Sequence, residues 1–463
     1  MVQKKNKNIE MITGDPKRAI VKLALPMMLS MLLIMLYNIA DSIWVAGLGA
    51  DALAAVGFIT PLFMVLVGLG NGIGAGANSL IARYIGAENY DEANNAALHG
   101  IVLSVIVSVI FTILIEVFMV PILQFMGAGE TIGYAMDYSY IIFGFLFVFV
   151  YSGVASAIFR SEGDMRRATI AIAVTAVMNI ILDPIFIYVL GFGIAGAAWA
   201  TVISAILSCL VMSYWIWGKK DLYLDLSPKN FKYKGSIMID TLQVAIPSTL
   251  ETIVFSALAI IINSMLVMAS GTTAVAVYTA SMRIVQLAMI PLIGLGTAVL
   301  TVSGVAYGAH NHVNLKTAHS YSIKLGFAIS IVLGAVMFVF ASPIATMFSY
   351  TEASAALSPQ IATAISVLSL FVLAIPHGMM SSMMFQGVGK GTYSLLITLL
   401  RSLILESVFA YVFCFIFGWG LPGIYGGVVF GCFVGGTIGY IWAKFFIRKF
   451  TQISIRKYTP QKD

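Results

Sequence analysis

The sequence predicts an all-α, polytopic membrane protein with twelve transmembrane helices. Its 463 residues are 60% hydrophobic and only 10% charged, whereas a soluble protein carries about 25% charged residues. Several apolar runs reach the ~20 residues that a membrane-crossing helix needs, for example 101–123, 195–217 and 323–347. The chain lacks the strict alternation of apolar and polar residues that is typical of β-barrel strands. These observations exclude an ordinary soluble enzyme.

Polar clusters and Gly or Pro residues divide the apolar sequence into twelve helical segments. The predicted helices cover residues 17–45, 52–83, 94–120, 133–160, 166–190, 194–218, 237–269, 273–306, 316–342, 358–386, 391–417 and 422–448. The polar, basic start of the chain has no short apolar core followed by a cleavage site, so we expect no removable signal peptide.

The basic residues predict the orientation. All Lys and Arg except Arg283 lie at the two termini or on and near the even-numbered connections between helices. By the positive-inside rule, the termini and these connections are cytoplasmic, in a cell (inner or plasma) membrane. The net charge of +6 therefore reflects membrane topology, and we expect no nucleic-acid partner.

Three matched pairs of segments, in register along the chain, indicate an internal repeat. The pairs are 84–97 with 306–319, 158–168 with 384–394, and 23–28 with 244–249. The repeat predicts two six-helix lobes of the same orientation, related by a parallel pseudo-two-fold axis, as in many secondary transporters. The predicted division is an N-terminal lobe (1–218), a cytoplasmic linker (219–236), a C-terminal lobe (237–448) and a cytoplasmic tail (449–463).

The glycine-rich stretch GLGNGIGAGANS, residues 68–79, has spacings similar to a dinucleotide-binding loop. No strand precedes it, and small residues allow close helix packing in membranes. We therefore predict a helix-packing role for it.

Asp41 is the first of several acids predicted to lie inside the membrane. An acid at the centre of a spanning helix costs about 2.5–3.5 kcal/mol on insertion scales, so it faces the protein interior or a wet cavity. Tyr37 and Asn38 precede Asp41 by four and three residues, which places all three on one helix face. The alternative is a hydrogen-bonded seam between helices, which a neutral residue would form at lower cost.

Asp183 is the second such acid, with Asn179 one turn before it and Pro184 directly after it. Proline removes a backbone donor and clashes with the carbonyl four residues earlier, so we expect a bend that loosens this carbonyl. A carboxylate, an amide oxygen and a free carbonyl are the hard oxygen ligands that a small cation prefers. The alternative is a simple proline kink with an incidental acid.

Four further charged residues are candidates for a second-lobe site or a gating role. Glu251, Glu406 and Arg283 all lie within predicted helices of the second half. We predict that Arg283 is buried and pairs with Glu251 or Glu406. Glu162 adjoins Gly163 at the end of a helix, where a solvated turn is the simpler interpretation.

The chain resembles the multidrug and toxic compound extrusion (MATE) transporters, in particular the DinF-like prokaryotic branch. The resemblance rests on LPMMLSMLLIMLYNIADSIWVAGLGADALAAVG, RYIGAEN, FRSEGDMRRA, NIILDPIFIYVLGFGIAGAAWAT and MMFQGVGKG. It covers nearly the whole chain and implies two six-helix lobes that export organic, often cationic or amphipathic compounds, driven by a cation.

The resemblance also implies roles for individual residues. The implied cation site consists of Asp41, Asn179, Asp183 and Thr201, and the implied substrate cavity contains Tyr37, Asn38, Tyr138 and Ser156. Ser156 stands where relatives often carry Asn. Other branches use a carboxylate in the seventh helix, where Glu251 lies at a different spacing from Pro247.

We therefore predict an antiporter that works by alternating access and uses H⁺ or Na⁺, with no cofactor and no enzymatic activity. Its expected partners are drug-like organic substrates and membrane lipids, and we expect a monomer. Two carboxylates close together would allow a proton as well as sodium to bind. One alternative is a flippase for lipid-linked saccharides, which should have more buried basic residues than Arg283 alone. A membrane-embedded enzyme is a second alternative, but no metal cluster or paired nucleophile and base supports it.

Overall fold

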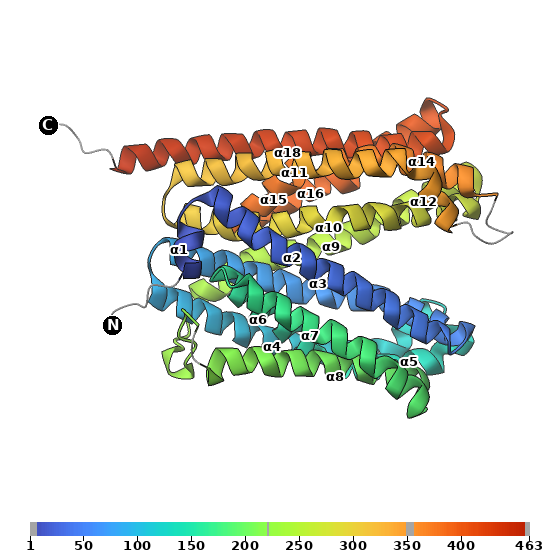
Figure 1. The fold of residues 1–463 in the computed structure, drawn as a ribbon, viewed down its shortest axis with the longest axis horizontal. Coiled ribbons are helices and arrows are strands. Elements are labelled where there is room, and N and C mark those ends of the chain that lie inside the picture. The colour runs from blue at the N-terminus through green and yellow to red at the C-terminus, as the bar shows by residue number, and fades with distance from the viewer. Residues whose placement is uncertain (1–6, 220–221, 349–355, 459–463) are drawn as a thin grey trace. The chain divides into compact units, whose positions relative to one another are not determined.

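The structure is a computed structural model that describes residues 7–219, 222–348 and 356–458, and these residues form helices without any strand (Figure 1). Ten helices are long and apolar enough to cross a membrane, and two bent helix pairs bring the number to as many as twelve. Every predicted span coincides with one of these helices or pairs. The all-α, polytopic prediction is confirmed.

The chain divides into two compact units, residues 1–14 with 26–249 and residues 15–25 with 250–463. The helices of unit 1 are α1 (Lys7–Thr13), α3 (Ala50–Gly86), α4 (Tyr90–Phe125), η1 (Gly129–Thr131), α5 (Ile132–Gly144), α6 (Leu146–Ser161), α7 (Met165–Pro184), η2 (Ile185–Val189), α8 (Gly193–Ser213), η3 (Tyr214–Gly218) and η4 (Pro228–Asn230). Two long helices, α2 (Pro16–Ala46) and α9 (Gly235–Ser270), contribute to both units.

Unit 2 contains the remaining helices. They are α10 (Thr272–Gly308), α11 (His312–Val339), α12 (Ala341–Phe348), α14 (Ser358–Ala374), α15 (Pro376–Gly387), α16 (Gly391–Thr398), η5 (Leu399–Glu406), α17 (Ser407–Tyr411), η6 (Val412–Ile416) and α18 (Gly420–Tyr458). The last helix continues ten residues beyond the predicted end at residue 448. Part of the segment predicted as a tail is therefore helical.

The structural units differ from the predicted lobes by two exchanged segments, residues 15–25 and 237–249. The start of α9 belongs to unit 1 because it packs against the glycines of α3. A Cβ atom on Gly76 would lie 2.4 Å from the carbonyl oxygen of Thr241. A Cβ on Gly74 would lie 3.0 Å from the carbonyl oxygen of Gly153 in α6. The predicted packing role of the glycine-rich stretch is thus confirmed.

The internal repeat is visible in the backbone. The span α5–α6 bends by 46°, and the corresponding span α14–α15 bends by 42°. Among the described non-glycine residues, only Glu88 (φ 56°) and His310 (φ 52°) have positive φ, a conformation that is uncommon outside glycine. Each is followed by an Asn that caps the next helix, Asn89 for α4 and Asn311 for α11. The same turn therefore occurs once in each unit.

A second repeated feature is a π-helical turn, η2 in unit 1 and η6 in unit 2. Each turn leads to a loop with two positive-φ glycines, Gly191 and Gly193 or Gly418 and Gly420. The predicted irregularity after Pro184 is therefore present, as a π-turn at the end of α7. Since η6 forms after Tyr411 without a proline, the proline is not required for this turn.

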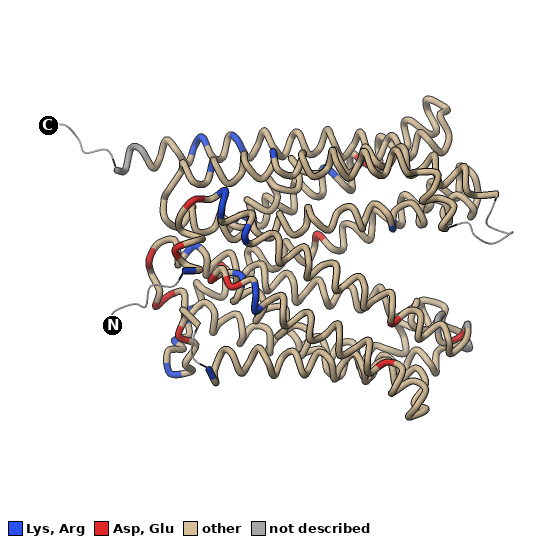
Figure 2. The backbone as a smooth tube through the Cα atoms, viewed as in Figure 1, with Lys and Arg blue, Asp and Glu red and all other residues tan. Residues whose placement is uncertain are grey.

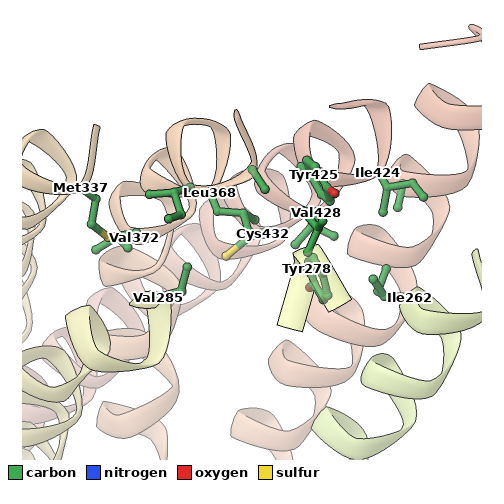
Figure 3. Packing of buried hydrophobic residues seen from close by; sticks show 14 of the residues in the cluster. Ile262, Tyr278, Val285, Met337, Leu368, Val372, Ile424, Tyr425, Val428 and Cys432 are labelled. Carbon is green, nitrogen blue, oxygen red and sulfur yellow. The ribbon is translucent and has the colours of Figure 1, made fainter. Parts of the chain in front are cut away.

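Unit 2 has an apolar core of buried side chains from α9, α10, α11, α14 and α18 (Figure 3). Tyr278 and Tyr425 stack with ring centroids 6.0 Å apart and an interplanar angle of 9°. Val428 and Cys432 lie on the same helix as Tyr425, and each follows at one-turn spacing. This repeated apolar face of α18 fixes the helix against its neighbours.

In each unit, most Lys and Arg residues gather toward one end of the helix bundle (Figure 2). The middle of the helices is almost free of charge except for the acids discussed below and a few arginines. This distribution agrees with the basic-residue pattern on which the predicted orientation is based.

Candidate cation-binding site

The site in unit 1 is formed around Asp183 and Asn179, which are one turn apart on α7 and fully buried. The Asn179 side-chain amide donates to Asp183 Oδ1 over 3.2 Å and to Thr201 Oγ1 of the adjacent helix α8 over 3.2 Å. The Thr201 hydroxyl in turn donates to the Ala197 carbonyl over 3.0 Å. Three of the four predicted cation-site residues are thus in direct contact.

Asp41, the fourth predicted residue, reaches the same cluster from α2. Its carboxyl group interacts with that of Asp183 by charge repulsion when both are ionised and by a hydrogen bond when one is protonated. Asp183 is completely buried, whereas Asp41 is partly exposed. The predicted pair of carboxyl groups is therefore present, and Asp41 is its more accessible member.

When both carboxyl groups are ionised, three oxygen atoms of this cluster are buried without a hydrogen-bond donor among the described residues: Asp41 Oδ1, Asn179 Oδ1 and Asp183 Oδ2. A buried polar atom without a partner costs about 1–3 kcal/mol, and more when it is charged. A bound cation or an added proton would remove this cost. Carboxylate, amide and hydroxyl oxygens are hard donors, of the type that small cations prefer.

The predicted cavity residues separate into two groups. Tyr138 is within electrostatic range of both carboxyl groups, and Tyr37 is within range of Asp41. Tyr138 is 9% exposed. Asn38 has an exposed side chain. Ser156 is buried, and its hydroxyl donates to Met212 Sδ over 3.7 Å. Of the predicted cavity residues, the two tyrosines are therefore the ones that interact with the carboxyl pair.

Unit 2 contains a second buried acid in a polar cluster. The Glu251 carboxylate accepts a hydrogen bond from Ser394 over 2.6 Å and one from the Gln386 amide over 3.2 Å. The sequence interpretation did not include Gln386 or Ser394. The internal repeat aligns Phe385 with Phe159, so Gln386 corresponds to the polar residue that follows Phe159. A polar residue at this position in both halves was the signal that could have identified Gln386.

The prediction that Arg283 is the buried basic partner of Glu251 or Glu406 is wrong. Arg283 is exposed and forms no salt bridge with any described carboxylate. Arg401, predicted near a cytoplasmic connection, instead lies within η5, is 8% exposed and interacts electrostatically with both acids. Arg401 falls within the predicted helix 391–417, but the basic-residue pattern grouped it with a cytoplasmic connection, and its burial in unit 2 was not predicted.

Glu162 is buried and not part of a solvated turn, and it lies in unit 1. Its carboxylate accepts hydrogen bonds from the backbone N–H groups of Leu224 (2.8 Å) and Tyr223 (3.3 Å) in the linker. Burial raises the pKa of Glu162 to about 7, against the lowering effect of these two N–H donors. Glu162 therefore attaches the linker to the end of α6.

These features define a multi-pass membrane transporter with two repeated units and a buried, cation-compatible site in the first. The MatE family model matches the chain twice, over residues 26–185 and 247–412. The chain belongs to the MATE family of multidrug efflux transporters, which are not enzymes. The two matched segments also coincide with the two halves of the internal repeat.

Individual relatives agree with this assignment. The chain is 28% identical to the multidrug export protein MepA of Staphylococcus haemolyticus, over 80% of this chain and 79% of that protein. It is 25% identical to a FAD transporter of Shewanella oneidensis, over 78% of each chain. A crystal structure of a MATE protein in complex with MaL6 is 39% identical and superposes with a TM-score of 0.94, covering 97% of this chain and 100% of the other.

Proposed function

We propose that this transporter is an antiporter in which H⁺ or Na⁺ binds to Asp41 and Asp183 and drives export of drug-like organic compounds. It acts as a monomer in the cell membrane, with both termini in the cytoplasm. The supporting observation is the set of three buried oxygens without hydrogen-bond donors. A cation that binds these oxygens stabilises the conformation in which they are accessible to it. Coupling between ion and substrate requires that each binds the two conformations with different affinity.

The expected substrates are drug-like compounds, because the related MepA is named a multidrug export protein. Organic cations and amphipathic compounds are the classes among them that an acidic site in a membrane favours. The tyrosines beside the carboxyl pair, Tyr37 and Tyr138, offer aromatic faces to which an organic cation binds favourably. If the coupling ion and the substrate bind at the same acidic site, they compete for it. Competitive binding at one site is the simplest mechanism by which a transporter exchanges an inward-moving ion for an outward-moving substrate.

A flippase for lipid-linked saccharides is the main rival from the same architecture. It would need buried positive charge for a pyrophosphate, and Arg401 is a buried cation in unit 2. Arg401, however, interacts with the two buried acids Glu251 and Glu406. The charge of Arg401 is therefore already opposed by these acids. Arg160, a second buried arginine, lies at the end of α6 without a salt bridge to a described carboxylate, so the choice of the drug exporter rests on the acidic site and the multidrug-exporting relatives.

The test is transport by the full-length protein in everted membrane vesicles. A pH gradient and a sodium gradient are imposed separately, and accumulation of a fluorescent organic cation is followed. Wild type should transport under at least one gradient, and Asp41→Asn should not. Transport by Asp41→Asn at the wild-type rate would refute the proposed coupling site. Transport of FAD in place of organic cations would refute the proposed substrate class.

A further inference from the structure

A strongly basic cavity in unit 2 lies outside the carboxyl cluster and outside the proposed transport mechanism. It has a volume of about 1030 Å³ and is formed by α11, α18 and the first turn of α2. Five of its lining residues carry a permanent positive charge: Lys17, Lys316, Lys324, Lys444 and Arg448. None of the described residues that line it is acidic.

The five cations are exposed, and none forms a salt bridge within the described part of the chain. Their charges are therefore not neutralised by any salt bridge from the described residues. Lys444 and Arg448 are one turn apart on α18 and share a helix face. Lys316 and Lys324 are two turns apart on α11, about 12 Å along the helix axis. The positive charge thus extends over more than the ~5–8 Å of one lipid headgroup layer.

Aromatic and apolar side chains form the walls between these cations. Val313 from α11 and Ile441 and Phe445 from α18 line the cavity. His319 is buried at its edge, hydrogen-bonds to Ser381 over 3.0 Å and stacks on Tyr440. The Lys444 ammonium lies over the same Tyr440 ring, 4.6 Å from its centroid, so this cation is held in place by the packing beneath it.

We propose that this cavity binds one anionic phospholipid, with its phosphate among the lysines and its acyl chains along the apolar walls. Charge complementarity favours an anion, and the apolar walls on two membrane-spanning helices favour an amphiphile over a soluble phosphate. Basic pockets between transmembrane helices bind anionic headgroups in this way. The volume is sufficient for a headgroup and the first carbons of its chains.

The experiment compares two short-chain lipids, dihexanoyl phosphatidylglycerol and dihexanoyl phosphatidylcholine, by calorimetric titration of the purified full-length protein. The test variant is Lys316→Gln/Lys324→Gln/Lys444→Gln. The matched control, Arg166→Gln/Lys229→Gln/Lys232→Gln, removes the same charge from exposed positions of unit 1. Each basic residue near an anionic headgroup changes affinity about fivefold, so the triple variant should lose on the order of a hundredfold.

Wild type and the control should prefer phosphatidylglycerol, and the test variant should bind both lipids equally. An equal loss in both variants, or no preference in wild type, would overturn the proposal. Inorganic phosphate and glycerol 3-phosphate are titrated as well, and binding as tight as that of phosphatidylglycerol would show a soluble-anion site instead. If the triple variant does not fold, Lys316→Gln and Lys444→Gln alone should each weaken phosphatidylglycerol binding about fivefold, and unchanged binding in both would refute the site.

Discussion

The two units share a backbone plan but differ in the chemistry they place on it. Counting from the π-turns and the positive-φ glycines aligns Asn179 with Glu406 and Asp183 with Ala410. The same count aligns Thr201 with Val428. Counting instead from the positive-φ glycines that precede α3 and α10, Gly49 and Gly271, aligns Asp41 with Asn263. Unit 2 thus lacks the carboxyl pair of unit 1 and has an acid where unit 1 has an amide.

This difference shows that the repeated fold supplies a scaffold and that substitutions at equivalent positions determine the site. In unit 1 the acids Asp41 and Asp183 form a pair with oxygens that lack donors. In unit 2 the acids Glu251 and Glu406 are accompanied by Arg401, and Glu251 accepts hydrogen bonds from two side chains. A satisfied acid has a structural role, and an unsatisfied pair is suited to exchanging an ion.

The largest expected effect separates these two roles. Asp183→Asn should reduce gradient-driven transport by at least about a hundredfold, because it removes one charge of the pair and costs several kcal/mol of ion binding. Glu406→Gln, at the position equivalent to Asn179, should leave transport within a few-fold of wild type. The rates are measured in proteoliposomes with matched protein content. Equal losses in both variants would show that the two units contribute alike.

The glycines that follow the π-turns should be equally sensitive in both units. A Cβ on Gly196 would lie 2.6 Å from the Phe186 carbonyl oxygen, and one on Gly423 would lie 2.7 Å from that of Phe413. Gly196→Ala and Gly423→Ala should each destabilise the protein by about 1–3 kcal/mol through overpacking. Thermal unfolding in detergent measures this effect. Gly57→Ala is the control, because nothing lies within 4 Å of its Cβ position.

Thr201→Val should weaken ion binding moderately. The substitution keeps the shape but removes the hydroxyl that accepts from the Asn179 amide over 3.2 Å. Loss of one hydrogen bond is worth about 1 kcal/mol, or roughly a fivefold weaker apparent ion affinity. Thr201→Ser retains the hydroxyl and should behave as wild type. A Thr201→Ser variant as weak as Thr201→Val would indicate that methyl packing, rather than the hydrogen bond, is important.

The last prediction concerns the linker of unit 1 and is local to it. The pKa of Glu162 is raised to about 7 by burial, above its value of about 4.3 in an unfolded chain. The stability that this group contributes is therefore fully present below pH ~4 and is lost as pH rises through ~7.

Hydrogen exchange of the Tyr223 and Leu224 amides measures this attachment. After correction for intrinsic exchange, the rates should increase about tenfold between pH 6 and pH 8. Glu162→Gln should remove this pH dependence, because the amide does not titrate. A pH profile that is the same in the variant and in wild type would show that Glu162 does not control the linker.

The sequence was sufficient to predict the twelve spans, because each apolar run is long and ends at polar or glycine-containing turns. It also predicted the contact between Asn179 and Asp183, since a four-residue spacing on a helix fixes that geometry. The resemblance added Thr201, which lies on another helix and which no local pattern indicates. Tertiary contacts of this kind need either a relative or a structure.

The incorrect predictions have a common physical origin in local backbone irregularity and in burial. Arg401 was grouped with a cytoplasmic connection by the positive-inside pattern, but it is buried within η5 and interacts with two acids. Glu162 was assigned to a solvated turn because it adjoins Gly163 at a helix end, and the linker residues that cover it, Tyr223 and Leu224, are 61 and 62 residues further along the chain. Neither the π-helical turn nor the long-range contact is encoded in a short sequence pattern.

The central claim, that the carboxyl pair of unit 1 exchanges a cation, is tested most directly by infrared difference spectroscopy of the purified protein. Raising the pH, or adding sodium at constant pH, should abolish a protonated-carboxyl band in wild type. Asp41→Asn and Asp183→Asn should each lack this change, whereas Glu251→Gln should retain it. A carboxyl signal that persists unchanged in both aspartate variants would contradict the account.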